Sequence, residues 1–192
     1  MIVIVLPDLP TEYDLLEQAS RGSQDALRQI YVAYFTPIYQ FIRIRVGNAQ
    51  LAEDLASEVF LDFVAAVKGR NPGPKKNLRG WLFRVARNKI YDHYGKDRQY
   101  PTTTLEEWMP DTSDENPEGQ FMRTLNVERA REALQQLAPD QQEVLILRFG
   151  QMLNLQETAD IMGKSVSAVK SLQFRAVERL RHILSELETA HG

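Results

Sequence analysis

The 192-residue chain contains no cysteine and three histidines. Without cysteine it cannot form disulfides, thiolate zinc sites, iron–sulfur clusters or a cysteine nucleophile. His93, His182 and His191 lie in different segments, outside any metal-binding pattern such as HExxH. The chain also lacks a phosphate-binding glycine loop and a nucleophile elbow. These absences argue against an enzyme, and the sequence predicts no cofactor and no metal site.

A membrane-spanning hydrophobic run is missing as well. Residues 1–6 are apolar, but this run has no basic flank and is too short for a signal peptide or a membrane span. The hydrophobic content of 43% and the charged content of 26% are typical of a soluble globular protein. We therefore expect a cytoplasmic protein without membrane insertion.

The net charge of −3 is distributed unevenly along the chain. Residues 11–98 carry 14 basic and 10 acidic groups, whereas residues 99–126 carry one basic and six acidic groups together with three prolines. The proline-rich acidic segment has no sustained apolar period and is typical of a linker. The sequence thus predicts a short tail over residues 1–10, a first domain over 11–98, a linker over 99–126 and a second domain over 127–192.

Both predicted domains show helical periodicity, and no segment alternates as a strand would. We expect an all-α protein with about four helices on each side of the linker. Ser23 and Asn48 are candidate N-caps, and Gly47 and Gly69 are candidate helix stops. Pro37 is expected to kink or split the first long helix. In the second domain four short helices are expected.

A helix-turn-helix pattern lies near the carboxy terminus. Ala159, Gly163 and Val169 have the spacing at which a small residue lets two helices approach, a glycine makes the turn and an aliphatic side chain fills the angle between them. The last helix is predicted to begin near Ser165. Its face opposite the apolar stripe carries Ser167, Lys170, Ser171, Phe174, Arg175 and Arg181.

Two interpretations of this outer face are open. Lysine, arginine and serine side chains can bind base edges or phosphates, and an exposed phenylalanine can meet a thymine methyl group. Alternatively, the face is a solvated surface that confers solubility. The position of Phe174 among cations after a turn glycine favours duplex DNA. Arg148, which precedes the turn, is a candidate phosphate contact or an ordinary surface arginine.

The first domain contains a strongly basic stretch. Residues 68–98 hold ten basic and two acidic groups, which favours binding to a nucleic-acid backbone. Aromatic residues between the cations can stack on unpaired bases, although Trp81 falls on the apolar stripe and is assigned to the core. The predicted single-strand contacts are Lys75, Lys76, Arg84, Arg87, Asn88 and Tyr91.

An acidic stripe lies on the neighbouring helix. Asp54, Glu58 and Asp62 repeat every four residues and therefore share one helix face. The stripe is interpreted either as a solvated face or as a docking surface for a basic partner.

Three blocks carry a resemblance to a known family: AEDLASEVFLDFVAAV, LRGWLFRVARNKIYDHY, and, after the acidic linker, LQQLAPDQQEVLILRFGQMLNLQETADIMGKSVSAVKSLQFRAVERLR. In this order the chain closely resembles the extracytoplasmic-function (ECF) branch of the sigma-70 family of bacterial RNA polymerase initiation factors. The resemblance implies a helical sigma region 2 and a helix-turn-helix sigma region 4. It also implies a non-enzymatic factor that directs promoter-specific initiation.

The resemblance further implies partners. Asp54, Glu58 and Asp62 match the helix that binds the β′ clamp helices of core RNA polymerase, and the β subunit is expected to be contacted too. The basic stretch matches the segment that recognises and melts the minus-10 element, and the loop over residues 69–77 matches one that captures a flipped base. The outer face of the last helix and Arg148 match positions that read the minus-35 duplex, and an anti-sigma factor is expected.

Two departures from the family pattern and two competing hypotheses accompany this interpretation. Leu172 and Gln173 stand where the family usually has a basic and then an apolar residue, and Ser57 stands where a glutamine is common. The first competing hypothesis is a stand-alone regulator that uses the helix-turn-helix on a symmetric operator. The second treats both domains as adaptor modules, which leaves the basic outer face unexplained.

Overall fold

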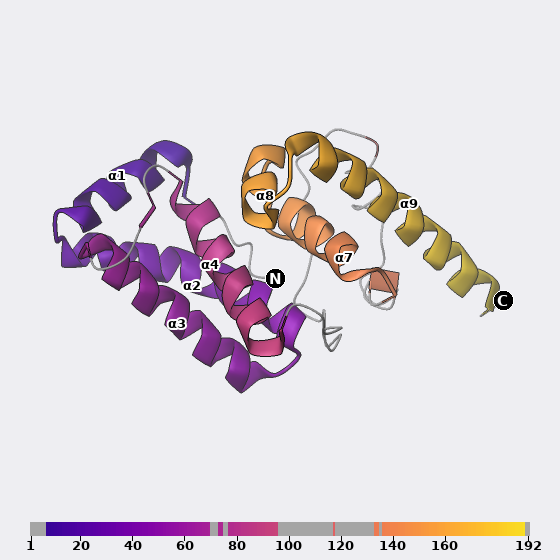
Figure 1. Cartoon of the computed structure of the whole chain (residues 1–192), viewed down its shortest axis with the longest axis horizontal. Coiled ribbons are helices and arrows are strands. Elements are labelled where there is room, and N and C mark those ends of the chain that lie inside the picture. Colours follow the sequence, from indigo (N-terminus) through magenta and orange to yellow (C-terminus); the bar gives the residue numbers. More distant parts are fainter. Residues whose placement is uncertain are drawn as a thin grey trace. The chain divides into compact units, whose positions relative to one another are not determined.

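A computed structural model of the chain describes residues 7–69, 73–74, 77–95, 117, 133–134 and 136–190 (Figure 1). These residues form helices and turns with no strand, which confirms the all-α prediction. The chain divides into two compact units, Met1–Thr103 and Thr104–Gly192. Most of the predicted linker lies outside the described residues, so its exact bounds stay a prediction.

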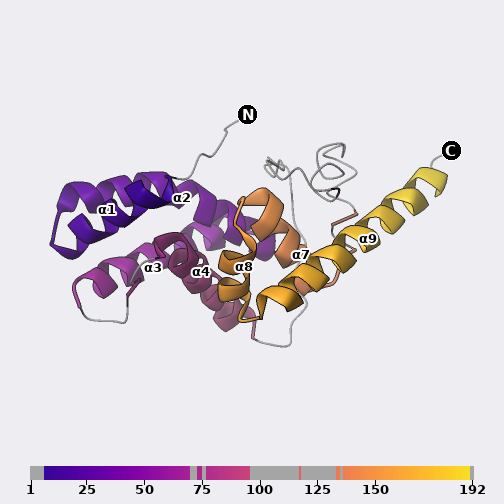
Figure 2. The same ribbon diagram turned by 90° about the horizontal axis from the view of Figure 1, so that it is seen from above.

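The described residues of the first unit form four helices: α1 (Leu9–Ser20), α2 (Gln24–Val46), α3 (Ala49–Val67) and α4 (Leu78–Tyr94). The long helix α2 packs against each of the other three, and its buried face supplies much of the core. Figures 1 and 2 show α1 beside α2 and α3 beside α4. This packing leaves the outer faces of α3 and α4 on the surface of the unit.

The ends of these helices follow the local sequence. The side chains of Ser23 and Asn48 accept hydrogen bonds from the third backbone N–H of α2 and α3, so both predicted caps are confirmed. Gly47 ends α2 in the left-handed region at φ 72°, and Gly69 follows the end of α3 at φ 72°. Helix α2 is not split at Pro37, which is buried within it.

A buried carboxylate ties three helices of the first unit together. Glu12 on α1 accepts hydrogen bonds from the Tyr34 hydroxyl at 2.7 Å, the Arg79 Nε at 2.7 Å and the Arg79 backbone N–H at 2.9 Å. Burial, followed by the Glu12 charge, raises the pKa of Tyr34 well above its usual range. Because α1, α2 and α4 meet at this carboxylate, it fixes the start of α4.

The second unit contains α7 (Pro139–Leu145), the π-helical turn η1 (Ile146–Gly150), α8 (Leu155–Met162) and α9 (Val166–Ala190). Helix α9 packs against α7 and α8. With 25 residues it forms one long helix (Figure 2), so the prediction of four short helices is wrong for this element. Buried apolar residues recur at helical spacing along α9 from Val169 to Ile183. Because this periodicity is not interrupted, the helix continues without a break.

The predicted helix-turn-helix geometry is present. Ala159 and Val169 are buried at the contact between α8 and α9, and Gly163 caps α8 in the left-handed region at φ 64°. Asn154 and Glu157 form a capping box that starts α8.

In the described part of the chain, no helix combines the length and the apolar character needed to cross a bilayer.

Candidate nucleic-acid interface

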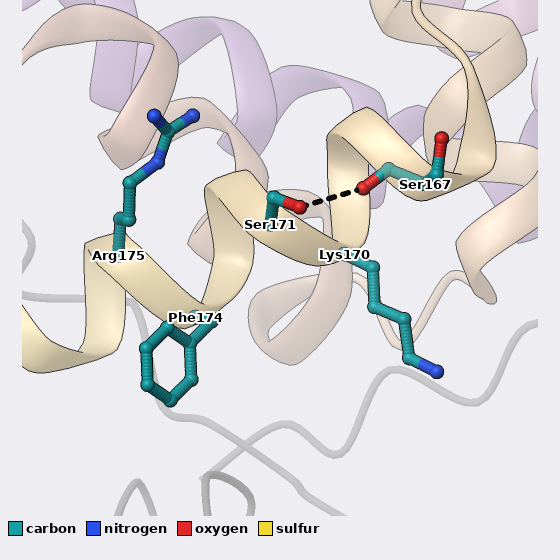
Figure 3. A pocket seen from close by; sticks show the side chains of 5 residues that line it. All are labelled: Ser167, Lys170, Ser171, Phe174 and Arg175. Carbon is teal, nitrogen blue, oxygen red and sulfur yellow. Dashed lines mark hydrogen bonds between the residues drawn. The ribbon is translucent and has the colours of Figure 1, made fainter.

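The outer face of α9 forms an open surface depression (Figure 3). Its lining residues are Ser167, Lys170, Ser171, Phe174 and Arg175. Phe174 is 56% exposed, so its ring is available for a ligand rather than used in the core. Lys170 and Phe174 extend from one side of the helix and Arg175 from the other. The sequence placed these five residues together correctly, whereas Arg181 is not among them and pairs with Glu178 at 2.7 Å.

Both serines of this depression already make hydrogen bonds near the start of α9. The Ser167 and Ser165 hydroxyl oxygens lie 3.1 Å apart, and either hydroxyl can be the donor. The Ser171 hydroxyl donates to the Ser167 backbone carbonyl at 3.0 Å, as drawn in Figure 3. Its proton is therefore engaged, and its oxygen is the atom that can accept from a ligand. Ser165 caps the helix start by accepting from the Ala168 N–H at 3.2 Å. The first turn of the recognition helix is thus locally fixed.

Arg148 lies apart from this depression, on η1. Its Nε donates to Oε1 of Gln173 at 2.8 Å, and its Nη1 donates to the Leu153 carbonyl. The side chain is half-buried, so it is not the freely solvated arginine of one sequence interpretation. Leu172 and Gln173, which depart from the family pattern, are both buried.

Helix α4 presents polar and aromatic groups at its surface. Arg84 and Asn88 are exposed, as predicted for nucleic-acid contacts. The Arg87 guanidinium lies 4.4 Å from the centre of the Tyr91 ring and donates to the Tyr91 hydroxyl at 3.1 Å. Trp81 packs against Phe63 on α3 but is only half-buried, so it lies at the edge of the core rather than within it as predicted. The predicted contacts Lys75 and Lys76 lie outside the described residues.

The acidic stripe on α3 is partly neutralised from within the unit. Lys89 of α4 reaches Glu58 at 3.0 Å and Asp62 at 2.9 Å, while Asp54 accepts from Gln50 on its own helix at 3.1 Å. Desolvation alone would lower the pKa of Lys89, but the hydrogen bonds to Asp62 and Glu58 outweigh it and raise that pKa. Lys89 therefore links the acidic stripe of α3 to α4.

Two cations counted in the basic stretch do not serve as surface cations. Arg79 is half-buried in its ion pair with the buried Glu12, and Lys89 is held by the acidic stripe. Charge counting along the sequence missed both pairings because the partners are 67 and 31 residues away. The +8 total over residues 68–98 thus overstates the positive charge that a nucleic acid would meet.

Comparison with known proteins assigns both units. The family description "Sigma-70 region 2" matches residues 30–99, and "Sigma-70, region 4" matches residues 133–182. Together the two matches cover more than half of the chain. The chain belongs to the sigma-70 family. Region 2 spans most of α2 together with α3 and α4, and region 4 spans α7, η1, α8 and most of α9.

Relatives place this sigma factor in the ECF branch. It is 36% identical to the ECF RNA polymerase sigma factor BldN of Streptomyces coelicolor over 90% of this chain and 66% of BldN. It is 32% identical to the ECF RNA polymerase sigma factor SigD of Mycobacterium tuberculosis over 87% of this chain and 81% of SigD. Sigma factors of this family are DNA-binding initiation factors and not enzymes.

Solved structures support the fold. The structure of CnrH in complex with the cytosolic domain of CnrY matches 95% of this chain and 99% of CnrH, with a TM-score of 0.64 and 23% identity. At this identity the likeness concerns the arrangement of helices alone. It agrees with the helical units that the structure of this sigma factor describes.

Proposed function

We propose that this sigma factor binds core RNA polymerase through α3, recognises and melts the minus-10 element with α4, and reads the minus-35 element with α9. The observation that carries the proposal is the exposed face of α9, where Phe174 and Arg175 line one depression with Lys170. A large exposed aromatic ring between two cations has no role in the core of the unit. It suits a duplex whose groove offers both methyl groups and acceptors.

The minus-35 contact divides into two kinds of interaction. Arg175 and Lys170 can donate to guanine O6 and N7 or to phosphates, and Ser171 can accept from a base amine through its free lone pairs. The Ser167 hydroxyl lies in the first helical turn, where the helix N-terminus favours a phosphate. Arg148 is not among the residues that line the depression, and we assign it a backbone contact rather than base readout.

The minus-10 contact is assigned to the exposed side of α4. The Arg87 guanidinium lies over the Tyr91 ring, and this cation–aromatic pair is proposed to take part in stacking on an unpaired base. Asn88, one turn away and exposed, has an amide that can pair with a base edge. Arg84 supplies a phosphate contact, and Lys75 and Lys76 are proposed to do so from the loop before α4.

The polymerase contact is assigned to Asp54, Glu58 and Asp62. All three carboxylates are at least partly exposed on α3. An acidic helix face fits a basic helical partner, for which the β′ clamp helices are proposed.

The acidic linker is proposed to follow the RNA exit path, and region 4 is proposed to contact the β subunit. Because core polymerase and promoter DNA are in the cytoplasm, we propose that this protein is cytoplasmic as well.

An anti-sigma factor is proposed as a further partner. A protein that covers the α3 stripe and the α9 face together would block both polymerase and DNA. A solved fold neighbour, RpoE of Bartonella quintana, was crystallised with the anti-sigma factor NepR. For this chain the proposal rests on the exposure of both surfaces, and co-purification from the native host would identify the partner.

Two measurements separate this function from a stand-alone regulator. In a pull-down with purified core polymerase, the sigma function predicts a stable complex that the triple variant Asp54→Asn, Glu58→Gln, Asp62→Asn weakens. In a gel shift without polymerase it predicts weak binding to duplex DNA. Tight binding of the isolated chain to a symmetric operator, without affinity for core, would support the regulator instead.

A further inference from the structure

Gln173 is a buried polar side chain on an otherwise apolar face of α9. It is 5% exposed, while its neighbours on that face, Val169, Ala176 and Val177, are fully buried and apolar. Its Oε1 accepts from Nε of Arg148 at 2.8 Å and thereby joins α9 to η1. We propose that Gln173 is a positioning residue that holds the Arg148 guanidinium where it contacts a phosphate of the minus-35 duplex. This inference rests on the proposed function.

Arg148 is held from two directions. Besides the bond to Gln173, its Nη1 donates to the Leu153 carbonyl in the loop between η1 and α8. Two acceptors on different elements fix both the position and the plane of the guanidinium. An arginine fixed in this way loses less rotational freedom on meeting a phosphate than a freely solvated one does. Gln173 therefore contributes to DNA binding without touching DNA.

The location of the pair favours a phosphate over a base. Arg148 is half-buried on η1 and is not among the residues that line the depression on the outer face of α9. The base-reading groups lie on that face, whereas Arg148 is bound to the buried Gln173 of α9, so we assign Arg148 to the DNA backbone rather than to a base. Phosphate contacts fix the register of a recognition helix and act on all sequences alike.

The test uses full-length protein assembled with core polymerase. The probe is a duplex that covers only the upstream half of a promoter selected by transcription mapping, and its affinity is measured over a series of KCl concentrations. The variants are Gln173→Met, which fills the volume without an acceptor, Arg148→Gln, and the double variant. Lys170→Gln is the matched comparison, because Lys170 is a proposed DNA contact with no bond to Gln173.

We expect Gln173→Met and Arg148→Gln each to weaken binding by roughly threefold to tenfold and to reduce the slope of log K against log salt by about 0.9, the value for one phosphate contact. The double variant should bind no more weakly than Arg148→Gln alone. Combined with Lys170→Gln, by contrast, the effect of Gln173→Met should multiply, because the two contacts are separate.

Two results would overturn the inference while leaving the proposed function intact. In one, Gln173→Met lowers the melting temperature but leaves affinity and salt slope unchanged, as expected for a packing residue. In the other, its effect multiplies with that of Arg148→Gln. Gln173→Leu repeats the test if the methionine variant does not fold. If Lys170→Gln and Arg175→Ala also leave duplex binding unchanged, the minus-35 assignment itself fails.

Discussion

Lys89 Nζ lies 2.9 Å from a carboxylate oxygen of Asp62, so an ion pair links the proposed DNA helix α4 to the proposed polymerase helix α3. The same ammonium group reaches Glu58 at 3.0 Å. One cation of α4 is thereby committed to the acidic stripe. Binding of a basic partner to that stripe must compete with this lysine.

Replacing Lys89 should change the affinity for core polymerase and the stability of the first unit in opposite directions. We expect Lys89→Met to bind core polymerase more tightly, because the stripe becomes more negative, and to unfold about 0.5–1 kcal/mol more easily, because two ion pairs are lost. Titration with core polymerase measures the affinity, and urea unfolding measures the stability. Lys68→Met, at an exposed lysine in the same unit, makes the same charge change away from the stripe. Equal affinities for the two variants would refute the competition.

The Lys89 contribution also has a predicted pH dependence. Its pKa is raised in the folded protein, so the stabilisation is complete below the unfolded pKa of about 10.4 and is lost as pH rises through the folded value. The difference in unfolding free energy between wild type and Lys89→Met should therefore be constant near neutral pH and shrink above about pH 10. A difference that grows with alkaline pH would contradict this sign.

Glu12 is expected to be essential for the first unit. Glu12→Gln leaves Arg79 without its carboxylate in a largely buried site and should cost about 3–5 kcal/mol of unfolding free energy. Glu17→Gln on the same helix breaks an exposed pair with Arg21 and should cost less than about 1 kcal/mol. Urea unfolding followed by circular dichroism compares them, and equal losses would show that Glu12 does not join the helices.

Arg175 is expected to read the minus-35 element. Arg175→Ala should cost roughly 1–3 kcal/mol of recognition and relax the sequence preference at one position. Stability should change by no more than about 0.5 kcal/mol, because the side chain is exposed. Arg179→Ala, one turn further along α9 and outside the depression, serves as the comparison. An unchanged promoter profile for Arg175→Ala would remove this residue from the site.

Tyr91 is expected to stack on an unpaired base. In the assembled holoenzyme, Tyr91→Leu should weaken binding of a single-stranded minus-10 oligonucleotide by about 1–3 kcal/mol. Duplex binding at the minus-35 element should be unaffected. Tyr94→Phe is a control on the same helix, because the Tyr94 hydroxyl donates to the Val46 carbonyl inside the unit. Equal losses for both variants would place the effect in the fold rather than in stacking.

Local patterns in the sequence were sufficient for much of this fold. The caps at Ser23 and Asn48, the turn at Gly163 and the shared face of Lys170, Phe174 and Arg175 depend on residues within one or two helical turns. Periodicity therefore predicts them. The same reasoning put Trp81 on a core stripe with Leu82 and Val85, but only Leu82 is fully buried, whereas Trp81 and Val85 are half-buried.

Pairings between distant residues could not be predicted in the same way. The partners of Lys89, Arg79 and Arg148 lie on other elements, and no spacing rule relates them to these cations. Charge counting consequently treated Lys89 and Arg79 as free cations. The polar residue Gln173 on an apolar helix face was the available signal for its pairing with Arg148, and packing of η1 against α9 was needed to interpret it.

Start-site mapping of transcripts made on genomic fragments by core polymerase, with and without this protein, tests the central claim most directly. The account predicts new start sites that appear only with the protein and that share two upstream elements at minus-10 and minus-35 spacing. Substitution of Arg175 should reduce these transcripts, and mutation of the upstream element should do the same. A start-site profile identical to that of core polymerase alone would contradict the assignment as a promoter-specificity factor.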